Sequence, residues 1–461
     1  MKVLVINSPL FREKNNLYDE DSLPPLGLGY IATILQNNDI DVKLIDAVHQ
    51  RIPLEDLVAT VNALKPEFIA INIFTTNYDL VKDFAESLQF STHFIVGGLS
   101  TKQLYQKILT WVTNNPIDIV TGDGELITLD IVKEELQELP FLTQGNRRVF
   151  LVDGKSSYEV KDISNVPLDR SFFLNEPVVH PLGFTEANIV TSRGCIYNCA
   201  FCAAARSLNK DYSIREKTEE SIVRELNEIV ASYPEVNSIR VLDDLFLKTN
   251  LSVQKAVNVF SQFMLQWRSM AHVMTFNNVD EAVMNQLKTS GCYELFIGIE
   301  SGSPKILGEI NKTKNVDTIL KNLTKVFKAG INMKGYFIYG FPGETKKDME
   351  MTFQLALKLK EISISNGVTF RTSVFQYRPY HGTQIYHDLE IKGENFKVEQ
   401  VQPNQGLSAL VGRLQFNFHS GNYSKVADNL LHDYIYRTIN LNDGKIFAGL
   451  ESKNQTMPKG M

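Results

Sequence analysis

The stretch ANIVTSRGCIYNCAFCAAAR, residues 187–206, contains three of the four cysteines of the chain. Cys195, Cys199 and Cys202 follow a strand-like run directly, with three and then two residues between them. Three thiolates on one short loop can wrap a soft metal centre, and their softness favours an iron–sulfur cluster, zinc or copper(I). The stretch therefore predicts a metal centre at the end of a strand.

The choice of metal depends on the number of ligands. A zinc site would need a fourth ligand, usually Cys or His at a second knuckle. His180 lies upstream across a proline-rich stretch, and Cys292, in SGCYELFIG, is interpreted as a core thiol. A four-iron cubane suits the loop better, because three thiolates leave one iron open to an external ligand. We expect an iron–sulfur cluster.

Around the cysteines, residues 186–385 alternate strand and helix patterns. The helical patterns include VQKAVNVFSQFMLQW and VDTILKNLTKVFKAG. The strand patterns are ANIVTS, SIRVLDD, VMTFNN, LFIGIE, GYFIYGF and TFRTSVFQY. These units fall short of the eight in a closed (β/α)8 barrel, so we expect a partial (β/α)6 barrel.

Upstream of the barrel, residues 1–137 also alternate strands and helices, which predicts a doubly wound parallel sheet of the Rossmann type. Ligands bind such sheets at the carboxyl ends of the strands, and several predicted strands end in small polar or glycine residues. The candidate ligand-binding residues at these ends are Thr75, Thr76, Gly97, Gly98 and Gly122.

Two irregular regions complete the predicted organisation. Residues 138–185 are expected to form a linker with a small ribbon, in which RVFLVDGKSSYEV makes a hairpin that turns at Asp153 and Gly154. Residues 386–461 are expected to form a small, mainly helical C-terminal region.

Composition narrows the class of protein. A chain of 461 residues with 43% hydrophobic and 22% charged residues should fold into two or three domains. The net charge of -6 argues against nucleic acid as a partner, and the pair Arg147–Arg148 is interpreted as a solvated turn. The sequence contains no apolar run of membrane-spanning length, so we expect a cytoplasmic protein with reduced thiols.

The cysteine loop resembles the CxxxCxxC signature of the radical S-adenosylmethionine (SAM) superfamily, including the aromatic Phe201 before the last cysteine. The motifs that follow, VLDDLF, GIESGS, INKT, YFIYGFPGET and YRPYHGT, agree in order and spacing. The resemblance implies a 4Fe-4S cluster whose free iron binds SAM. It also implies that an electron cleaves SAM to a 5′-deoxyadenosyl radical, which abstracts hydrogen from unactivated carbon.

The resemblance also implies roles for particular residues. Glu300, in GIESGS, resembles the polar residue that contacts the amino or ribose groups of SAM, and Ser301 follows it. Asp243 and Asp244 resemble an acidic pair after the second barrel strand, one of which would cap a turn while the other faces SAM or substrate.

Two further points concern the later barrel strands. Tyr339 and Gly340 resemble the segment whose backbone approaches the adenine. Related sequences often carry a basic residue at the end of the third barrel strand, where this chain is expected to have Asn277 and Asn278, so no partner for the SAM carboxylate is assigned. No catalytic acid, base or hydrogen donor is assigned either.

A front sheet followed by this barrel resembles the cobalamin-binding radical SAM enzymes. PPLGLGYIATIL, VKLIDA, FIVGG and DIVTGDGE carry this resemblance. The segment DAVHQRIP lacks the Asp-x-His-x-x-Gly pattern that supplies a cobalt ligand, so His49 is interpreted as a surface histidine. The five strand-end residues named above would then pack around cobalamin whose lower face has no histidine ligand.

The resemblance leaves alternatives open. With cobalamin, it implies methyl transfer from SAM to a carbon or phosphorus centre of a small molecule, with a flavodoxin- or ferredoxin-type reductant. Without cobalamin, it implies dehydration, deoxygenation or rearrangement. A simple electron-transfer protein should carry more cysteine sets, and a nucleotide-binding module would leave the cysteine loop without a purpose.

Overall fold

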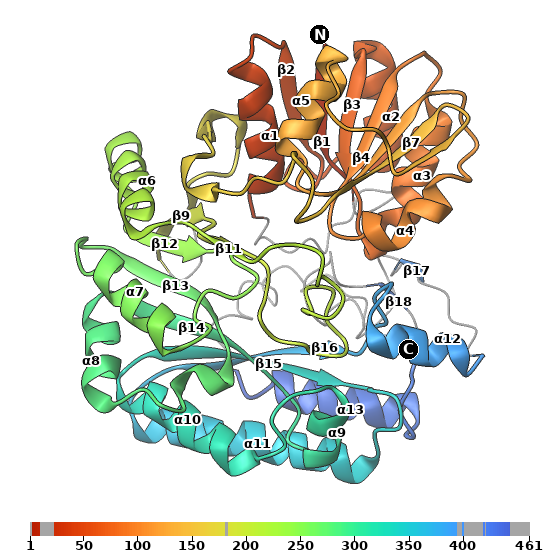
Figure 1. Ribbon diagram of the computed structural model, residues 1–461. Coiled ribbons are helices and arrows are strands. Elements are labelled where there is room, and N and C mark those ends of the chain that lie inside the picture. Colours follow the sequence, from red (N-terminus) through yellow and green to blue (C-terminus); the bar gives the residue numbers. More distant parts are fainter. Residues whose placement is uncertain are drawn as a thin grey trace, which may run out of the picture. The chain divides into compact units, whose positions relative to one another are not determined.

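The computed structural model describes residues 2–9, 23–179, 183–393, 399–400, 418–419 and 421–442. The described residues form an α/β protein with two large sheets (Figure 1). The chain divides into two compact units. The first unit comprises Met1–Val178, Ala187–Ala231 and Arg378–Ser420, and the second comprises Val179–Glu186, Ser232–Tyr377 and Gly421–Met461.

The front sheet lies in the first unit and has the strand order β2-β1-β3-β4-β5-β7-β6. The first six of these strands are parallel, and β6 pairs with β7 in the antiparallel sense at the edge. The strands are β1 (Val3–Asn7), β2 (Val42–Asp46), β3 (Phe68–Asn72), β4 (His93–Gly97), β5 (Ile117–Gly122), β6 (Leu142–Gln144) and β7 (Arg147–Val152). The predicted doubly wound sheet is confirmed.

Helices cover both faces of the front sheet because its strands carry apolar residues on both sides. Leu4 and Ile6 of β1 pack on one side with helices α2, α3 and α4, and Val3 and Val5 pack on the other with α1 and α5. The helices are α1 (Leu26–Gln36), α2 (Leu54–Leu64), α3 (Tyr78–Ser87), α4 (Thr101–Ile108) and α5 (Glu125–Lys133), and a short 3-10 turn, η1 (Thr75–Asn77), precedes α3.

The barrel sheet has the order β16-β15-β14-β13-β12-β9-β8, and every pairing from β12 to β16 is parallel. The strands are β8 (Val178–Val179), β9 (Thr185–Ile189), β12 (Ser238–Val241), β13 (Gln266–Ala271), β14 (Cys292–Glu300), β15 (Asn332–Tyr339) and β16 (Phe370–Gln376). The sheet curls without closing, and the predicted partial barrel is confirmed.

Helices and short elements connect these strands. The helices are α6 (Glu219–Ser232), α7 (Asn250–Phe260), α8 (Glu281–Thr289), α9 (Pro304–Glu309), α10 (Val316–Lys328), α11 (Lys346–Ser365), α12 (Gln384–Ile391) and α13 (Asp428–Ile439). The short strands are β10 (Ser192–Arg193), β11 (Arg215–Glu216), β17 (Glu399–Gln400) and β18 (Phe418–His419), and the 3-10 turns are η2 (Ile163–Asn165), η3 (Arg170–Phe172) and η4 (Val273–Phe276).

The third barrel strand was predicted at the wrong place. VMTFNN forms the 3-10 turn η4, and the strand is β13, which contains Trp267 from the end of a predicted helix. Helix α7 ends at Phe260, and Trp267 then stacks on the Phe260 ring at 4.6 Å. The His272 side chain accepts a hydrogen bond from the Met274 amide and so caps the turn, which ends the strand before the apolar run of η4.

The predicted ribbon turns at another place. The hairpin connects β6 to β7 through Gly145 and Asn146, whereas Asp153 and Gly154 follow the end of β7. Gly145 has φ +62°, a backbone conformation that suits glycine in a tight turn.

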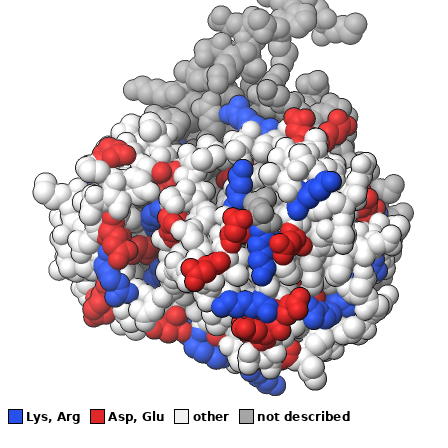
Figure 2. All heavy atoms as spheres, turned by 90° about the horizontal axis from the view of Figure 1, so that it is seen from above, with Lys and Arg blue, Asp and Glu red and all other residues white. Residues whose placement is uncertain are grey.

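Arg147 and Arg148 therefore lie on a strand rather than in a solvated turn. Arg148 makes two hydrogen bonds of 2.6–2.7 Å to Asp118 on β5, and Arg147 donates to carbonyls that follow α4. On the face shown in Figure 2, acidic and basic side chains alternate rather than gather by sign. None of the described helices is long and apolar enough to span a bilayer.

Candidate active site

The cysteine loop begins five residues beyond the last residue of β9 with Gly194, whose φ of +89° turns the chain away from β10. Cys195, Cys199 and Cys202 form no disulfide bond among the described residues and are half-buried. Backbone hydrogen bonds hold the loop compact: the Cys202 amide donates to the Cys199 carbonyl at 3.1 Å, and the Arg206 amide donates to the Tyr197 carbonyl at 2.8 Å. Burial raises the pKa of Tyr197, and the neighbouring Cys195 and Cys199 thiols add to the increase.

The donor chemistry of this loop fits an iron–sulfur cubane, because three thiols within eight residues can each ligate a different iron. Among the described residues, no three His, Cys, Asp or Glu side chains are placed to share a single metal ion. The fourth cysteine, Cys292, is fully buried on β14, where burial raises the pKa of its thiol. Phe201 is half-buried beside Cys202 in the loop.

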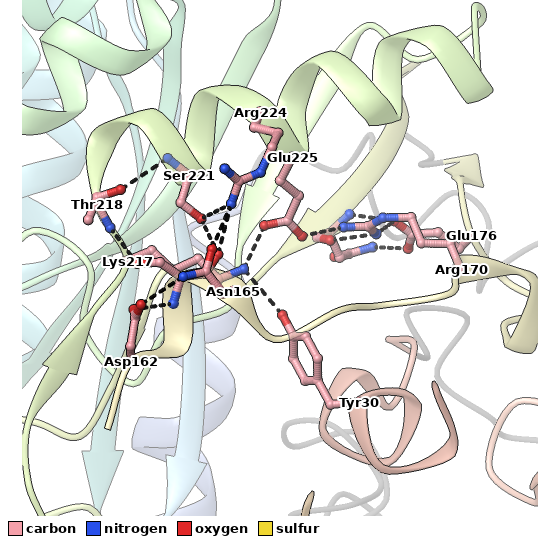
Figure 3. A network of polar contacts seen from close by, with 12 residues as sticks. Tyr30, Asp162, Asn165, Arg170, Glu176, Lys217, Thr218, Ser221, Arg224 and Glu225 are labelled. Atoms are coloured by element: carbon pink, nitrogen blue, oxygen red, sulfur yellow. Dashed lines mark hydrogen bonds and ion pairs between the residues drawn. The ribbon is translucent and has the colours of Figure 1, made fainter. Parts of the chain in front are cut away.

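A buried polar network stands beside the loop in the first unit (Figure 3). The Lys217 ammonium, one residue after β11, lies between the Glu225 carboxylate at 2.7 Å and the Tyr30 hydroxyl at 3.4 Å. Arg170 joins Glu225 at 2.8 Å to Glu176 at 2.7 Å. Tyr30 lies on α1 of the front domain, and Glu225 lies on α6, which follows the cysteines in the sequence. The network therefore links the front domain to the segment after the cysteine loop.

The segment after β16 also contacts the loop within the first unit. The Ile385 amide donates to the Ala200 carbonyl at 3.2 Å, and burial raises the pKa of Tyr380 to about 12, with nearby Cys202 contributing. One residue further on, a His381 ring nitrogen lies 3.1 Å from the Thr75 hydroxyl. The motif YRPYHGT thus contacts the edge of the front sheet through His381, and Ile385, two residues after the motif, contacts the cysteine loop.

The predicted ligand-binding residues of the front sheet all lie at its carboxyl edge. Thr75 is buried and its amide donates to the Ser100 hydroxyl, and Thr76 is half-buried in the same 3-10 turn. A Cβ atom at Gly97 would meet no atom of the described residues within 4 Å, whereas one at Gly98, with φ +113°, would lie 2.8 Å from the Ile73 carbonyl. Gly97 is therefore an open position, and Gly98 is required by the backbone.

The remaining glycine of this set is close to the segment that follows the cysteines. Gly122 has φ +97°, and a Cβ atom there would lie 2.1 Å from the Val152 carbonyl and 2.8 Å from the Tyr212 ring. The Tyr212 hydroxyl donates a hydrogen bond to the Thr121 hydroxyl on β5 at 3.2 Å. Residues after the cysteine loop thus pack directly on the last strand of the predicted ligand edge.

His49 lies in the turn after β2 and is half-buried. Its amide, like that of Val48, donates to the carboxylate of Asp46, which also accepts a hydrogen bond from the Asn7 amide group at 2.7 Å. Burial raises the pKa of Asp46. The segment DAVHQ is thus organised as a turn around a buried carboxyl.

In the second unit, Glu300 ends β14 with an unusual conformation. Its φ is +66°, which is strained for a residue other than glycine, and the pairing with β15 shifts register between Gly298 and Glu300. The carboxylate is buried and accepts a hydrogen bond from Lys312 at 2.8 Å, and the same ammonium donates to the Gly298 carbonyl at 2.6 Å. Strain of this kind concentrates at functional sites.

Two residues of this cluster were missed from the sequence. Lys312 belongs to the INKT motif, which could have identified it as the cation beside Glu300. His272 follows β13 directly, so it occupies the end of the third strand to which Asn277 and Asn278 had been assigned. Burial lowers the pKa of His272 to about 3, and the nearby Lys312 contributes, so its ring is neutral.

Hydroxyl groups hold the two residues that follow Glu300 in the sequence. The Ser301 hydroxyl lies 2.9 Å from the Thr352 hydroxyl on α11, and the Gly302 amide donates to the same oxygen at 3.0 Å. A Cβ atom at Gly302 would lie 2.3 Å from the Met351 carbonyl, so the backbone approaches α11 as closely as glycine allows. Ser301 is fully buried and positions the turn.

The turn after β15 contains the other predicted residues of this edge. Tyr339 is fully buried and its hydroxyl pairs with Thr438 at 2.8 Å, while Gly340 has φ +93°. The buried Glu344 carboxyl accepts hydrogen bonds from the Gly340 and Phe341 amides. Burial raises the pKa of Glu344 to about 8.

The two residues of the acidic pair after β12 differ in burial. Asp243 is 4% exposed, whereas Asp244 is exposed to solvent. The two carboxylates therefore occupy different environments, with Asp243 buried within the chain.

Comparisons with known proteins find two family models that match parts of this chain. Residues 189–356 match the model of the radical SAM superfamily, and residues 19–132 match that of the B12 binding domain. An uncharacterised methyltransferase of Pyrococcus horikoshii is 28% identical over 79% of this chain and 78% of its own. Cytidylyl-2-hydroxyethylphosphonate methyltransferase of Streptomyces wedmorensis is 22% identical over 85% of this chain and 82% of its own.

Solved structures share the fold. The radical SAM methyltransferase TsrM from Kitasatospora setae, with cobalamin and a [4Fe-4S] cluster bound, superposes with a TM-score of 0.64 at 14% identity, covering 96% of this chain and 91% of that one. OxsB, a cobalamin-dependent SAM radical enzyme, superposes with a TM-score of 0.66 at 14% identity, covering 99% of this chain and 69% of that one.

Proposed function

Because the chain belongs to the radical SAM superfamily and carries a B12 binding domain, we propose that it is a cobalamin-dependent methyltransferase that cleaves SAM at a 4Fe-4S cluster. The acceptor is an unactivated carbon, or a phosphorus centre, of a small molecule. A flavodoxin- or ferredoxin-type protein supplies the electron. The methyltransferase relatives support methyl transfer, and one of them acts on a phosphonate.

One structural observation carries the proposal. The cysteine loop and the carboxyl edge of the front sheet belong to the same compact unit. The Tyr212 hydroxyl donates a hydrogen bond to the Thr121 hydroxyl on β5. In addition, the Lys102 ammonium of α4 donates to the Leu208 carbonyl and pairs with Asp211 at 3.0 Å. The edge that would bind cobalamin is therefore built together with the loop that would bind the cluster.

In the proposed enzyme, Cys195, Cys199 and Cys202 ligate the cluster, and Phe201 shields it. When bound, the cluster provides the electron that splits SAM, and cobalamin carries the methyl group. Thr75, Thr76, Gly97, Gly98 and Gly122 form the edge on which the corrin packs. Gly97 leaves room for such a ring, since a side chain atom there meets no neighbour.

At the barrel edge, charge complementarity assigns the residues that hold SAM. Lys312 is the cation for the SAM carboxylate and Glu300 the anion for its amino group, and the two already form a buried pair. Ser301 fixes the turn, and the backbone of Tyr339 and Gly340 lies against the adenine. Asp243 caps the turn after β12, and the exposed Asp244 is left to face SAM or substrate.

The test uses protein purified anaerobically from cobalamin-fed cells and reconstituted with iron and sulfide. We expect corrinoid absorption together with cluster absorption, and formation of both S-adenosylhomocysteine and 5′-deoxyadenosine on addition of SAM and reductant. The first product reports methyl transfer and the second reports radical formation.

The outcomes separate the two branches of the family. A colourless front domain with 5′-deoxyadenosine as product would favour the cobalamin-free branch, in which the enzyme dehydrates, deoxygenates or rearranges its substrate. Absence of both products from protein with a full cluster would contradict the proposed function altogether.

A further inference from the structure

The cysteine loop is closed at its base by a small antiparallel ladder. Strands β10 and β11 pair Ser192 with Glu216 and Arg193 with Arg215. All three cysteines lie in the loop between these two arginines. Like charges directly opposite each other on paired strands repel, so the ladder that closes the loop opposes its own closure.

An aspartate from the front domain lies between the two arginines. Asp123 follows β5 in the turn that leads to α5, and one of its oxygens accepts hydrogen bonds from Arg193 at 3.0 Å and from Arg215 at 3.2 Å. Its other oxygen accepts a further hydrogen bond from Arg215 and one from the Val160 amide at 2.9 Å. The side chains of Asp123 and Arg215 are 9% and 10% exposed, so solvent screens these charges weakly.

A second acid from the same turn completes the arrangement. Glu125, the first residue of α5, pairs with Arg193, and the Arg193 guanidinium lies 5.7 Å from the centre of the Tyr30 ring on α1. Two carboxylates thus face two guanidinium groups. The arginines come from the base of the cysteine loop, whereas both acids come from the front domain.

A comparison inside the front sheet separates this arrangement from ordinary packing. Asp118, near the start of β5, also binds an arginine through two hydrogen bonds, but its partner Arg148 lies on the adjacent strand β7. That pair joins two strands of one sheet. Asp123, one residue beyond the end of the same strand, instead joins the sheet to the two arginines at the base of the cysteine loop.

We propose that Asp123 is a positioning residue for the cluster-binding loop, acting by neutralising the facing pair Arg193–Arg215. The turn of the front domain is then part of the metal centre, although it supplies no ligand. The proposal rests on the proposed function, because it takes the cysteine loop as the site of the cluster. It extends that function by making cluster assembly depend on the domain that would bind cobalamin.

The test measures the loop in the apoprotein. Reduced protein is treated with iodoacetamide under anaerobic conditions, and alkylation of each cysteine is followed by mass spectrometry. In Asp123→Asn, the three loop cysteines should react roughly tenfold faster, because loss of the shared anion leaves two part-buried cations facing each other. The buried Cys292 serves as an internal reference and should react slowly in every variant.

Two variants distinguish positioning from general destabilisation. Asp118→Asn is the matched control, since it removes an arginine partner from the same strand, and its loop cysteines should react at the wild-type rate. In Asp123→Asn/Arg215→Gln the facing charge is removed, and the rate should return to within about twofold of wild type. If Asp123→Asn does not fold, Glu125→Gln gives the same test with a smaller increase.

Iron loading keeps the two proposals apart. Asp123→Asn should bind less iron than wild type at limiting iron, and the double variant should recover. A wild type that binds no iron would contradict the proposed function while leaving the alkylation result to decide on Asp123. Equal alkylation rates in wild type and Asp123→Asn, an equal increase in Asp118→Asn, or no recovery in the double variant would overturn the role of Asp123.

Discussion

Two turns of this protein have nearly the same sequence pattern and different physical organisation. TGDGE, residues 121–125, follows β5 in the front sheet, and YGFPGE, residues 339–344, follows β15 in the barrel. The second residue of each is a glycine at positive φ, +97° for Gly122 and +93° for Gly340, and each ends in a buried glutamate. Both lie at the carboxyl end of a parallel strand, where ligands bind in such sheets.

The difference lies in the partners of their acids. In the front turn, burial alone would raise the pKa of Asp123, but the hydrogen bond from Arg215 and the charges of both arginines hold it below its ordinary value. In the barrel turn, Glu344 receives hydrogen bonds from two backbone amides, and its other oxygen has no partner among the described residues. The front turn is held to the cysteine loop by ion pairs of Asp123, whereas the barrel turn is organised by the neutral carboxyl group of Glu344.

The largest expected effect comes from exchanging the first glycine of each turn for alanine. Both changes strain a left-handed backbone by roughly 1–3 kcal/mol. Gly122→Ala also forces a Cβ atom to 2.1 Å from the Val152 carbonyl, whereas the Cβ atom of Gly340→Ala lies 3.4 Å from the Leu431 side chain and 3.7 Å from that of Gln376. We expect Gly122→Ala to prevent folding of the first unit and Gly340→Ala to fold with reduced stability, as measured by urea unfolding. Equal stabilities would contradict the packing of Gly122.

The second prediction concerns pH. Glu344 has a pKa of about 8 in the folded chain against an ordinary value of 4.5, so the folded state binds more protons between these values. Stability should therefore fall as the pH rises from about 5 to 8, by at most ~1.4 kcal/mol per pH unit. Glu344→Gln should flatten this slope, as followed by urea unfolding at each pH. Asp162→Asn is the control and should leave it unchanged, because the pKa of Asp162 is lowered and its partners Ser164 and Asn165 do not titrate.

Asp123 should respond with the opposite sign. Its folded pKa lies below the ordinary value, so the stability it contributes is present above pH 4 and is lost as the pH falls through the folded pKa. Acidification should therefore open the cysteine loop, whereas alkaline pH should loosen the turn after β15. If the cysteine loop and the turn after β15 both loosened in the same direction of pH change, the proposed difference between the partners of Asp123 and Glu344 would be wrong.

The smallest expected effect on stability concerns Gly97→Ala. Because the added methyl group meets nothing within 4 Å in the part of the chain that the structure describes, we expect the free energy of unfolding of the apoprotein to change by less than about 0.5 kcal/mol. If the corrin packs on this edge, cobalamin affinity should fall roughly tenfold, measured by absorbance titration. Unchanged affinity would remove Gly97 from the cofactor edge.

Much of the fold could be predicted because strand and helix periods are local properties of the sequence. The Val- and Ile-rich runs of β1 to β5 and the six barrel strands were recognised, with the exception of β13. That strand, QWRSMA, contains no β-branched residue and follows closely on the apolar end of α7, so the helix pattern was extended over Trp267. The turn at Gly145 was missed because Asp-Gly at residues 153–154 is the stronger turn signal.

The candidate site was less predictable because its contacts join distant segments. The three cysteines stand together in the sequence and were found there. Lys312 and His272 were not, since the proximity of Lys312 to Glu300 and to His272 depends on the ends of β13 and β14. The pairing of Asp123 with Arg193 and Arg215 joins residues about 70 and 92 positions apart, and no local pattern indicates it.

The most direct test of the cysteine loop compares wild type with Cys199→Ala and Cys292→Ala after anaerobic reconstitution. Each protein is analysed for iron and sulfide and is then incubated with SAM and reductant, and 5′-deoxyadenosine is quantified. We predict that Cys199→Ala loses the cluster and the product while Cys292→Ala keeps both, because Cys292 is a core thiol on β14. Formation of 5′-deoxyadenosine by Cys199→Ala at the wild-type rate would contradict the assignment of the cysteine loop as the metal centre.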